Sequence, residues 1–258
     1  LRERFAWRIL LGKDRSVNAF ALPGGYLGVH LGLIAVVTSR DELASVLAHE
    51  LSHVTQRHIS RSMEAQGRMT PWVIGSLILG ALAASKSPQA TQALVVGGQA
   101  AAVQSQLSYS RDMEREADRI GFGVLSEAGY DPRGFVTMFG KLQQAAGVND
   151  NGAYPYLRSH PLTTERIADM QSRLPLGSRA SASGPDLVQA LASARARVFS
   201  QSQVDQLRAW TELPSSLPAQ ATTAQRAGSL YAATLAWQRL QAPEAAQRAW
   251  QTLQTLTQ

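Results

Sequence analysis

The chain has 258 residues, a formal net charge of +6 and no cysteine. This length allows one sizeable core with a smaller appendage, and the absence of cysteine excludes a disulfide framework, a thiol nucleophile and a thiolate metal site. No stretch approaches the roughly 20 apolar residues of a membrane-spanning helix, and the scattered basic residues do not indicate nucleic-acid binding. A basic surface instead suits anionic lipid or an acidic partner.

The first segment predicts a helix followed by a β-hairpin. Residues 1–12 have the apolar spacing of a helix end and close with a glycine. Residues 17–22 alternate as a strand, the Pro-Gly-Gly sequence at residues 23–25 forms a turn, and residues 26–31 return as the partner strand. If the first of these strands lies at an exposed edge, an extended substrate can add to it as another strand.

The next segment predicts a buried helix. Asp41 and Glu42 supply acidic residues for its first turn, and apolar residues recur at helical spacing as far as Val54. Further along, residues 72–84 form an apolar run without charge, and residues 93–103 form a milder one. This pair predicts a buried helical hairpin or, alternatively, a patch that associates with a membrane.

The remaining sequence predicts helices separated by polar loops. The expected helices are 111–128, 131–146, 163–174, 187–203 and two within 224–257 that join near residue 243, and the expected loops are 147–161 and 213–220. Glycine, serine and proline are frequent in residues 175–185, which marks a domain boundary. We therefore expect a domain at residues 1–175, a linker at residues 176–186 and a helical region at residues 187–258.

The helical region contains the spacing of one tetratricopeptide repeat. Trp237, Ala246 and Trp250 match its large, small and large packing positions. Because such a repeat needs neighbours to bury its faces, we expect further repeats beyond Gln258.

The HELSH sequence at residues 49–53 is the most informative motif. On a helix, His49 and His53 lie on one face within reach of one metal ion, and Glu50 points beside that ion. This spacing predicts zinc-assisted hydrolysis of a peptide bond, with Glu50 taking a proton from water and passing it to the leaving amine.

A third zinc ligand is expected from a carboxylate or histidine on another element. Glu114 and Asp118 stand four residues apart on one face of a predicted helix, whereas Glu116 faces elsewhere. We expect Glu114 to bind zinc and Asp118 to accept the free ring N–H of a ligand histidine, which fixes its tautomer. The alternative is a solvated, salt-bridged helix face, and we expect that arrangement for Glu116 and Arg115.

These motifs resemble the gluzincin metallopeptidases of the HtpX and CAAX prenyl protease type 1 family. The resemblance rests on HELSH followed by SRDMEREAD at residues 110–118, and it extends to the segments 17–25 and 159–166. It covers about residues 1–175. The chain lacks the long apolar segments of membrane-spanning members, so it is most similar to the periplasmic branch with tetratricopeptide repeats, the β-barrel assembly-enhancing proteases of Gram-negative bacteria.

By position, the resemblance implies a role for each residue of the two motifs. It implies that His49, His53 and Glu114 bind zinc, that Glu50 is the catalytic base and that Asp118 supports a ligand histidine.

His160 lies in the predicted loop 147–161. The resemblance implies that it is a regulatory extra zinc ligand that keeps the enzyme latent, and the alternative is that it approaches the substrate carbonyl during turnover. Arg166 is expected either to stabilise an oxyanion near the site or to form a structural salt bridge. His30 and His58 have no partner at ligand spacing, so we expect structural roles for both.

The sequence thus predicts a mainly α-helical (α+β) zinc endopeptidase domain with a small β-hairpin or sheet, followed by a tetratricopeptide-like helical region. The resemblance implies a periplasmic enzyme that cleaves unfolded or misassembled outer-membrane β-barrel proteins, with the outer-membrane assembly machinery as a further candidate partner and with peripheral membrane contact. A chaperone or assembly scaffold with a latent, histidine-regulated zinc site is the alternative. A peptidase anchored through residues 72–84 is another. Because folded sequence begins at Leu1, we expect the targeting segment to lie outside the chain.

Overall fold

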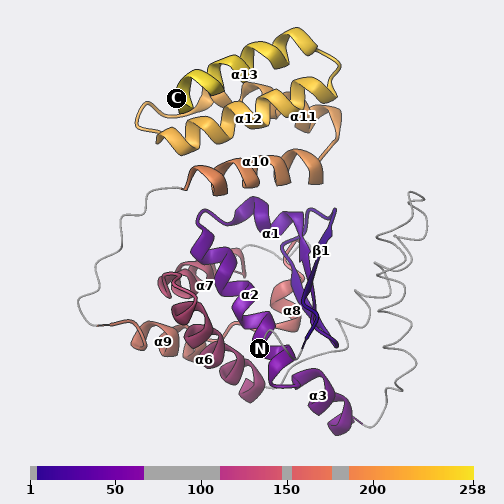
Figure 1. Cartoon of the computed structure of the whole chain (residues 1–258), viewed down its shortest axis with the longest axis vertical. Coiled ribbons are helices and arrows are strands. Elements are labelled where there is room, and N and C mark those ends of the chain that lie inside the picture. Colours follow the sequence, from indigo (N-terminus) through magenta and orange to yellow (C-terminus); the bar gives the residue numbers. More distant parts are fainter. Residues whose placement is uncertain (1–4, 67–110, 147–152, 176–185) are drawn as a thin grey trace.

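The computed structural model describes residues 5–66, 111–146, 153–175 and 186–258. Within these ranges the protein is mainly α-helical with one small sheet, which confirms the predicted fold class (Figure 1). The helices are α1 (Leu31–Val36), α2 (Arg40–Thr55), α3 (His58–Gln66), α6 (Arg111–Glu127), α7 (Arg133–Ala146), α8 (Tyr156–Ser159), α9 (Thr164–Ser172), α10 (Leu187–Ser200), α11 (Val204–Ser216), α12 (Thr223–Arg239) and α13 (Pro243–Thr257).

The predicted β-hairpin is confirmed by strands β2 (Ala19–Leu22) and β3 (Tyr26–His30), which pair antiparallel. Gly24 and Gly25 form the turn with φ values of 89° and 91°, a region of backbone conformation that favours glycine. Strand β2 lies at one edge of the described sheet, whose order is β1-β3-β2.

The prediction of a helix at residues 1–12 is wrong. Residues Arg8–Gly12 form strand β1, which pairs parallel with β3 from Arg8 opposite Tyr26 to Gly12 opposite His30. A short apolar run is compatible with helix or strand, and here the open backbone of β3 decides the outcome. The glycine does not end a helix; it leaves room for the His30 ring, whose nearest atom would lie 2.9 Å from an added Cβ.

Helix α2 forms the centre of the larger body. The Ser39 side chain accepts a hydrogen bond from the Glu42 backbone N–H, and acidic residues fill the first turn, as predicted. The helix packs against α6, α7 and the sheet, so its buried face is enclosed on several sides (Figure 1). At the crossing with α6, a Cβ added to Gly121 would lie 3.1 Å from the His49 backbone nitrogen, so the two helices approach closely at the motif.

Helices α10–α13 form a second layered body above α1 (Figure 1). Its apolar cluster consists of Ala194, Val198, Leu207, Ala232 and Ala236. The joint between the bodies is polar: the Ser193 hydroxyl donates to the carbonyl oxygens of Ile34 and Val37 at 2.8 and 3.0 Å, and Arg197 Nε donates to the Ala35 carbonyl at 3.0 Å. These carbonyls end α1, so α10 caps that helix.

The two helices predicted within residues 224–257 are confirmed as α12 and α13, but the predicted loop 213–220 is partly wrong. Helix α11 continues to Ser216 and includes Pro214. Trp210 and Leu213 pack against the apolar cluster, which stabilises a last turn that proline disfavours. The tetratricopeptide assignment stays a prediction: Ala246 is buried as that repeat requires, whereas Trp250 is 39% exposed.

Other predictions fall partly or wholly outside the described residues. The apolar runs 72–84 and 93–103 lie outside them, as does most of the linker 176–186, and the domain boundaries stay a prediction. The predicted loop 147–161 contains the single-turn helix α8, and the helix expected after it is confirmed as α9, capped by Thr163. Among the described residues, no helix is both long and apolar enough to cross a membrane.

Candidate metal centre and active site

Helix α2 places His49 and His53 one turn apart on its buried face. Their Nε2 atoms lie 3.0 Å from each other, so both rings point to the same spot. Because a ring nitrogen without its proton is an electron-pair donor, two such atoms at this distance need a proton or a cation between them. The structure therefore brings the predicted pair together as the helical spacing indicated.

Helix α6, which packs against α2, supplies two carboxylates that contact these histidines. Glu114 Oε2 lies 3.4 Å from His49 Nε2, and Glu114 Oε1 lies 3.4 Å from His53 Nε2. One turn further, Asp118 Oδ1 lies 2.9 Å from His49 Nδ1. When His49 is neutral, as a metal ligand must be, this contact holds its proton on Nδ1 and leaves Nε2 to donate an electron pair.

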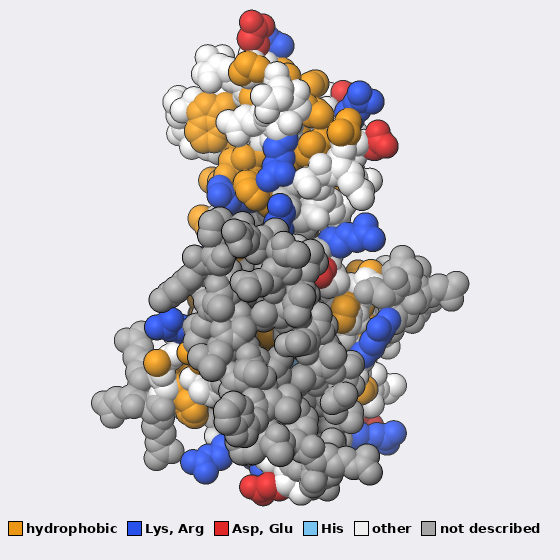
Figure 2. Space-filling view, turned by 90° about the vertical axis from the view of Figure 1, so that its right-hand side faces the viewer, with side chains coloured by type: hydrophobic (Ala, Val, Ile, Leu, Met, Phe, Trp, Pro, Cys, Tyr) orange, Lys and Arg blue, Asp and Glu red, His pale blue; other side chains and the backbone are white. Residues whose placement is uncertain are grey.

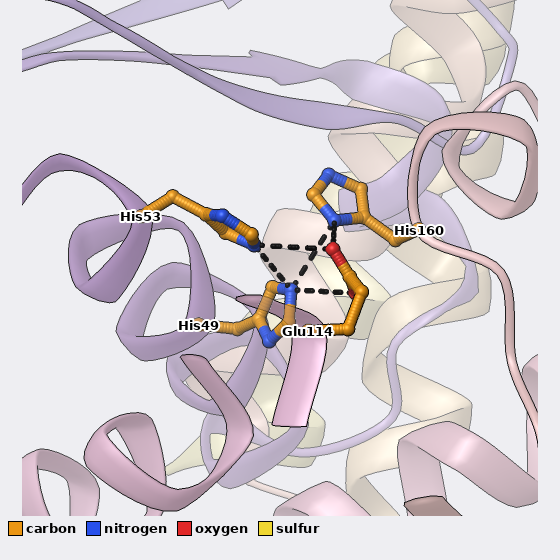
Figure 3. A group of neighbouring side chains, drawn as sticks. All are labelled: His49, His53, Glu114 and His160. Atoms are coloured by element: carbon orange, nitrogen blue, oxygen red, sulfur yellow. Dashed lines mark hydrogen bonds and ion pairs between the residues drawn. The ribbon is translucent and has the colours of Figure 1, made fainter. Parts of the chain in front are cut away.

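His160 reaches the same spot from the end of α8 (Figure 3). Its Nδ1 lies 3.0 Å from Glu114 Oε1 and 3.2 Å from His49 Nε2. Its Nε2 lies 3.3 Å from Glu50 Oε1. His160 thus stands between the group of donor atoms and the predicted catalytic base.

Ligand-capable atoms of His49, His53, Glu114 and His160 all lie within 4.8 Å of one another, and each of these residues is buried. Three imidazoles and one carboxylate drawn together in the interior form a donor set for a divalent metal. Without a cation, this arrangement would place several electron pairs in close contact away from water.

Arg166 on α9 contacts both carboxylates of the site, Asp118 and Glu114. Its Nε and Nη2 donate to the two oxygens of Asp118 at 2.6 and 2.8 Å, and its Nη1 lies 2.7 Å from Glu114 Oε2. The Nη1 atom also donates to the Pro161 carbonyl at 2.9 Å, next to His160. Arg166 therefore forms a buried salt bridge within the site, one of the two roles that the sequence left open.

The charges around the site shift the protonation of its members in the metal-free fold. Burial alone would lower the pKa of His49, but hydrogen bonds with Asp118 and Glu114 outweigh it and raise the pKa to about 10. Burial also raises the pKa of Glu50, and the positive charges of His160 and His49 only partly offset this effect. A carboxylate with a raised pKa is suited to accept a proton near neutral pH.

His58 was expected to have a structural role, and the structure places it beside the site, in a contact that the sequence did not indicate. Helix α2 ends at Thr55, and Arg57 adopts a positive φ of 55° that turns the chain before α3 begins at His58. This turn brings His58 Nδ1 to 2.9 Å from His53 Nδ1. On a continuous helix the two residues would face different directions, so the sequence spacing gave no signal of the contact.

Tyr156 is a second residue that the sequence did not single out. It is buried, and its ring stacks on that of His160 with centroids 4.6 Å apart and planes inclined by 27°. This contact fixes the orientation of the His160 ring. His30, by contrast, lies away from the donor group: its Nδ1 is 2.9 Å from the Ser16 hydroxyl.

Comparison with known proteins agrees with this geometry. The sequence pattern of the family described as Peptidase family M48 matches residues 2–174. The chain belongs to peptidase family M48. The match contains the whole candidate site, from His49 to Arg166, so this part of the chain is an M48 peptidase domain with a group of residues able to bind a metal.

Several M48 relatives carry descriptive names. The chain is 42% identical over 161 residues to a putative beta-barrel assembly-enhancing protease of Vibrio cholerae, covering 62% of this chain and 33% of the relative. It is 41% identical over 168 residues to the beta-barrel assembly-enhancing protease of Escherichia coli K12, covering 64% and 33%. A mitochondrial metalloendopeptidase OMA1 of Schizosaccharomyces pombe is 32% identical over 169 residues, covering 66% and 47%. The matched region thus spans about a third of the length of the bacterial relatives.

Proposed function

We propose that this chain is a zinc-dependent endopeptidase whose metal is bound by His49, His53 and Glu114. The observation that carries the proposal is the convergence of these three buried side chains and His160 within 4.8 Å, with Glu50 alongside. A lone HExxH motif is weak, but the Glu114 carboxylate, brought to it from a separate helix further along the chain, makes a specific arrangement.

The donor set and its spacing favour zinc. Histidine nitrogens with one carboxylate oxygen are the ligands of many catalytic zinc sites, and zinc prefers tetrahedral coordination. With bonds of about 2.0–2.2 Å, tetrahedral ligand atoms lie about 3.3–3.6 Å from one another. The distances that link His49 Nε2 to its neighbours in the group are 3.0, 3.2 and 3.4 Å, and all four ligand atoms lie within 4.8 Å of one another, so one ion can reach them after small side-chain movements.

When bound, zinc would supply Lewis-acid chemistry that polarises a peptide carbonyl and acidifies water. The chain's own part is to move protons at Glu50, whose carboxylate takes one from the attacking water and then protonates the leaving amine. Asp118 and Arg166 do not touch the substrate in this scheme. They hold the His49 ring and the Glu114 carboxylate in place through buried ion-pair contacts, and a charged hydrogen bond from Arg166 Nε to Asp118 joins the two.

We further propose that His160 keeps the site latent. Its Nδ1 is positioned as a fourth donor, and a fourth protein ligand would occupy the position that a catalytic zinc site leaves to water. Its Nε2 also lies beside the catalytic base. Activity then requires the segment with His160 and Tyr156 to withdraw.

The substrate class and location are proposals drawn from the relatives. The names of the bacterial relatives state a role in β-barrel assembly, so we propose unfolded or misassembled outer-membrane β-barrel proteins as substrates and the periplasm as the location. The outer-membrane assembly machinery is the proposed partner, and peripheral membrane contact is a further proposal. Strand β2 lies at an edge of the described sheet and next to α2, a position where an extended polypeptide can add as a strand.

Cleavage of unfolded protein by the zinc-loaded chain tests this function. A denatured β-barrel protein and a denatured helical protein of similar size should be offered to the wild-type chain and to Glu50→Gln. We expect cleavage by the wild type, faster on the β-barrel protein, and a loss of about 10²- to 10⁴-fold in Glu50→Gln with zinc retained. Equal rates for both variants would refute the assignment of Glu50, and equal rates on both substrates would refute the substrate class.

The contact of His160 with the donor group also favours the alternative of an assembly scaffold with a silent zinc site. In cells with an outer-membrane assembly defect, the two functions separate. Full complementation by Glu50→Gln would favour the scaffold, whereas loss of complementation would favour the peptidase.

A further inference from the structure

Behind His53, on the side away from the donor group, two further side chains contact one another in a row, and the catalytic scheme does not use them. Its Nε2 faces the donor group, and its Nδ1 lies 2.9 Å from Nδ1 of His58, which is fully buried. On the far side of His58, Nε2 lies 3.1 Å from Glu116 Oε2. The order is therefore His53, His58 and Glu116, leading outward from the metal position.

The distances between His53, His58 and Glu116 determine which of their nitrogen atoms carry protons. For His53 to bind a metal through Nε2, its proton must be on Nδ1, which then donates to Nδ1 of His58. His58 Nδ1 must accept, so the His58 proton is on Nε2 and is donated to the Glu116 carboxylate. The opposite tautomer of His58 would place two N–H groups against each other at 2.9 Å. Glu116 thus selects the tautomer of His58, and His58 selects that of His53.

Glu116, the outermost of these three residues, is held by a further contact from helix α3. Arg61 on α3 donates from Nη1 to the same Glu116 oxygen at 2.9 Å. Because Glu116 is on α6 and His58 and Arg61 are on α3, the contacts also join these two helices. The solvated salt bridge expected for Glu116 is present, but it holds a buried histidine as well.

We propose that His58 and Glu116 are positioning residues that fix the tautomer and ring orientation of His53 and thereby set the affinity of the site for its metal. The inference rests on the proposed metal site. The two ligand histidines would then be oriented by different means, His49 directly by Asp118 and His53 through an imidazole backed by Glu116.

The zinc dissociation constant, measured by competition with a chromophoric chelator, tests this proposal. His58→Leu keeps bulk but removes the acceptor, and we expect the affinity to fall by about 10- to 100-fold. His58→Asn can place its amide oxygen where Nδ1 stands, so it should lose less than about tenfold. His30→Leu is the matched control, because His30 lies outside the site, and its affinity should equal that of the wild type.

A second readout separates positioning from a general loss of fold. The visible absorption spectrum of the cobalt-substituted protein reports the geometry of the ligands, and thermal unfolding of the metal-free protein reports stability. We expect a changed cobalt spectrum in His58→Leu and a return toward the wild-type spectrum in His58→Asn. A folded His58→Leu with wild-type zinc affinity and an unchanged spectrum would overturn the inference.

The same series keeps this inference distinct from the proposed function. If wild-type protein binds zinc, His53→Ala abolishes binding and His58→Leu does not weaken it, only the inference fails. If the wild type itself does not bind zinc, the proposed function fails and the inference fails with it.

Discussion

His160 Nδ1 and Glu114 Oε1 lie 3.0 Å apart in the interior, although the whole of helix α7 lies between α6 and α8 along the chain. A hydrogen bond to a charged group is worth about 1.5–3 kcal/mol. This contact therefore favours the arrangement with His160 in the site over one with His160 withdrawn by roughly 10- to 100-fold. Under the latency proposed for His160, this contact would keep a site that is complete in its residues at low activity.

We therefore predict that His160→Ala raises the rate of cleavage of an unfolded polypeptide by about 10- to 100-fold, with zinc content unchanged. Ser159→Ala serves as the control, since it leaves the His160 side chain in place. Lower activity in His160→Ala would mean that this histidine acts in turnover rather than in latency.

Arg166 should matter for stability far more than a surface arginine nearby. Arg166→Ala leaves the buried carboxylates of Asp118 and Glu114 without their cation, and we expect a loss of about 3–5 kcal/mol in the free energy of unfolding. Arg173→Ala removes only the partly exposed pair with Asp169, worth about 0.3–0.5 kcal/mol. Chemical denaturation of the metal-free proteins measures both, and equal effects would show that the buried network contributes little.

The closeness of α2 and α6 can be tested with two glycines of α6. A Cβ on Gly121 would meet Ala48, His49 and Phe135 at 3.1 Å, whereas a Cβ on Gly123 would meet nothing within 4 Å. We expect Gly121→Val to cost about 1–3 kcal/mol by overpacking and to weaken zinc binding, because the ligands on the two helices are pushed apart. Gly123→Val should stay within about 0.5 kcal/mol of the wild type. Wild-type zinc affinity in a folded Gly121→Val would contradict the claim that this crossing positions the ligands.

The hydrogen bonds between α10 and α1 should contribute to the free energy of unfolding. Ser193→Ala removes the donor that satisfies the carbonyls of Ile34 and Val37, and we expect a loss of about 1–3 kcal/mol in unfolding free energy. The Ser200 hydroxyl donates only to the Arg197 carbonyl among the described residues, so Ser200→Ala should cost less than about 0.5 kcal/mol. Similar small losses in both variants would show that the polar joint does not stabilise the protein.

The parts of the site that lie on continuous helices could be predicted from sequence. His49 and His53, or Glu114 and Asp118, share a face because the helical period fixes their directions, and the structure places them as that period indicates. The meeting of the two pairs depends on the crossing of α2 and α6, for which sequence spacing offers no measure. The family resemblance supplied that step, and residues 2–174 match the family.

The failures of prediction occur where the backbone leaves regular structure or where distant segments decide the conformation. His58 was missed because Arg57, with a positive φ, turns the chain between α2 and α3. Residues 8–12 form a strand because β3 offers a pairing edge, a contact that local sequence does not encode. Helix α11 runs through Pro214 because tertiary packing of Trp210 and Leu213 outweighs the local signal for a loop.

If Glu114 completes a metal site with His49 and His53, its loss must remove the metal. The zinc content of purified protein should be measured by elemental analysis for the wild type, Glu114→Ala and the control Glu127→Ala, which changes an exposed residue of the same helix. We expect about one zinc ion per chain in the wild type and in Glu127→Ala, and little or none in Glu114→Ala. Zinc retained undiminished in Glu114→Ala would contradict that expectation.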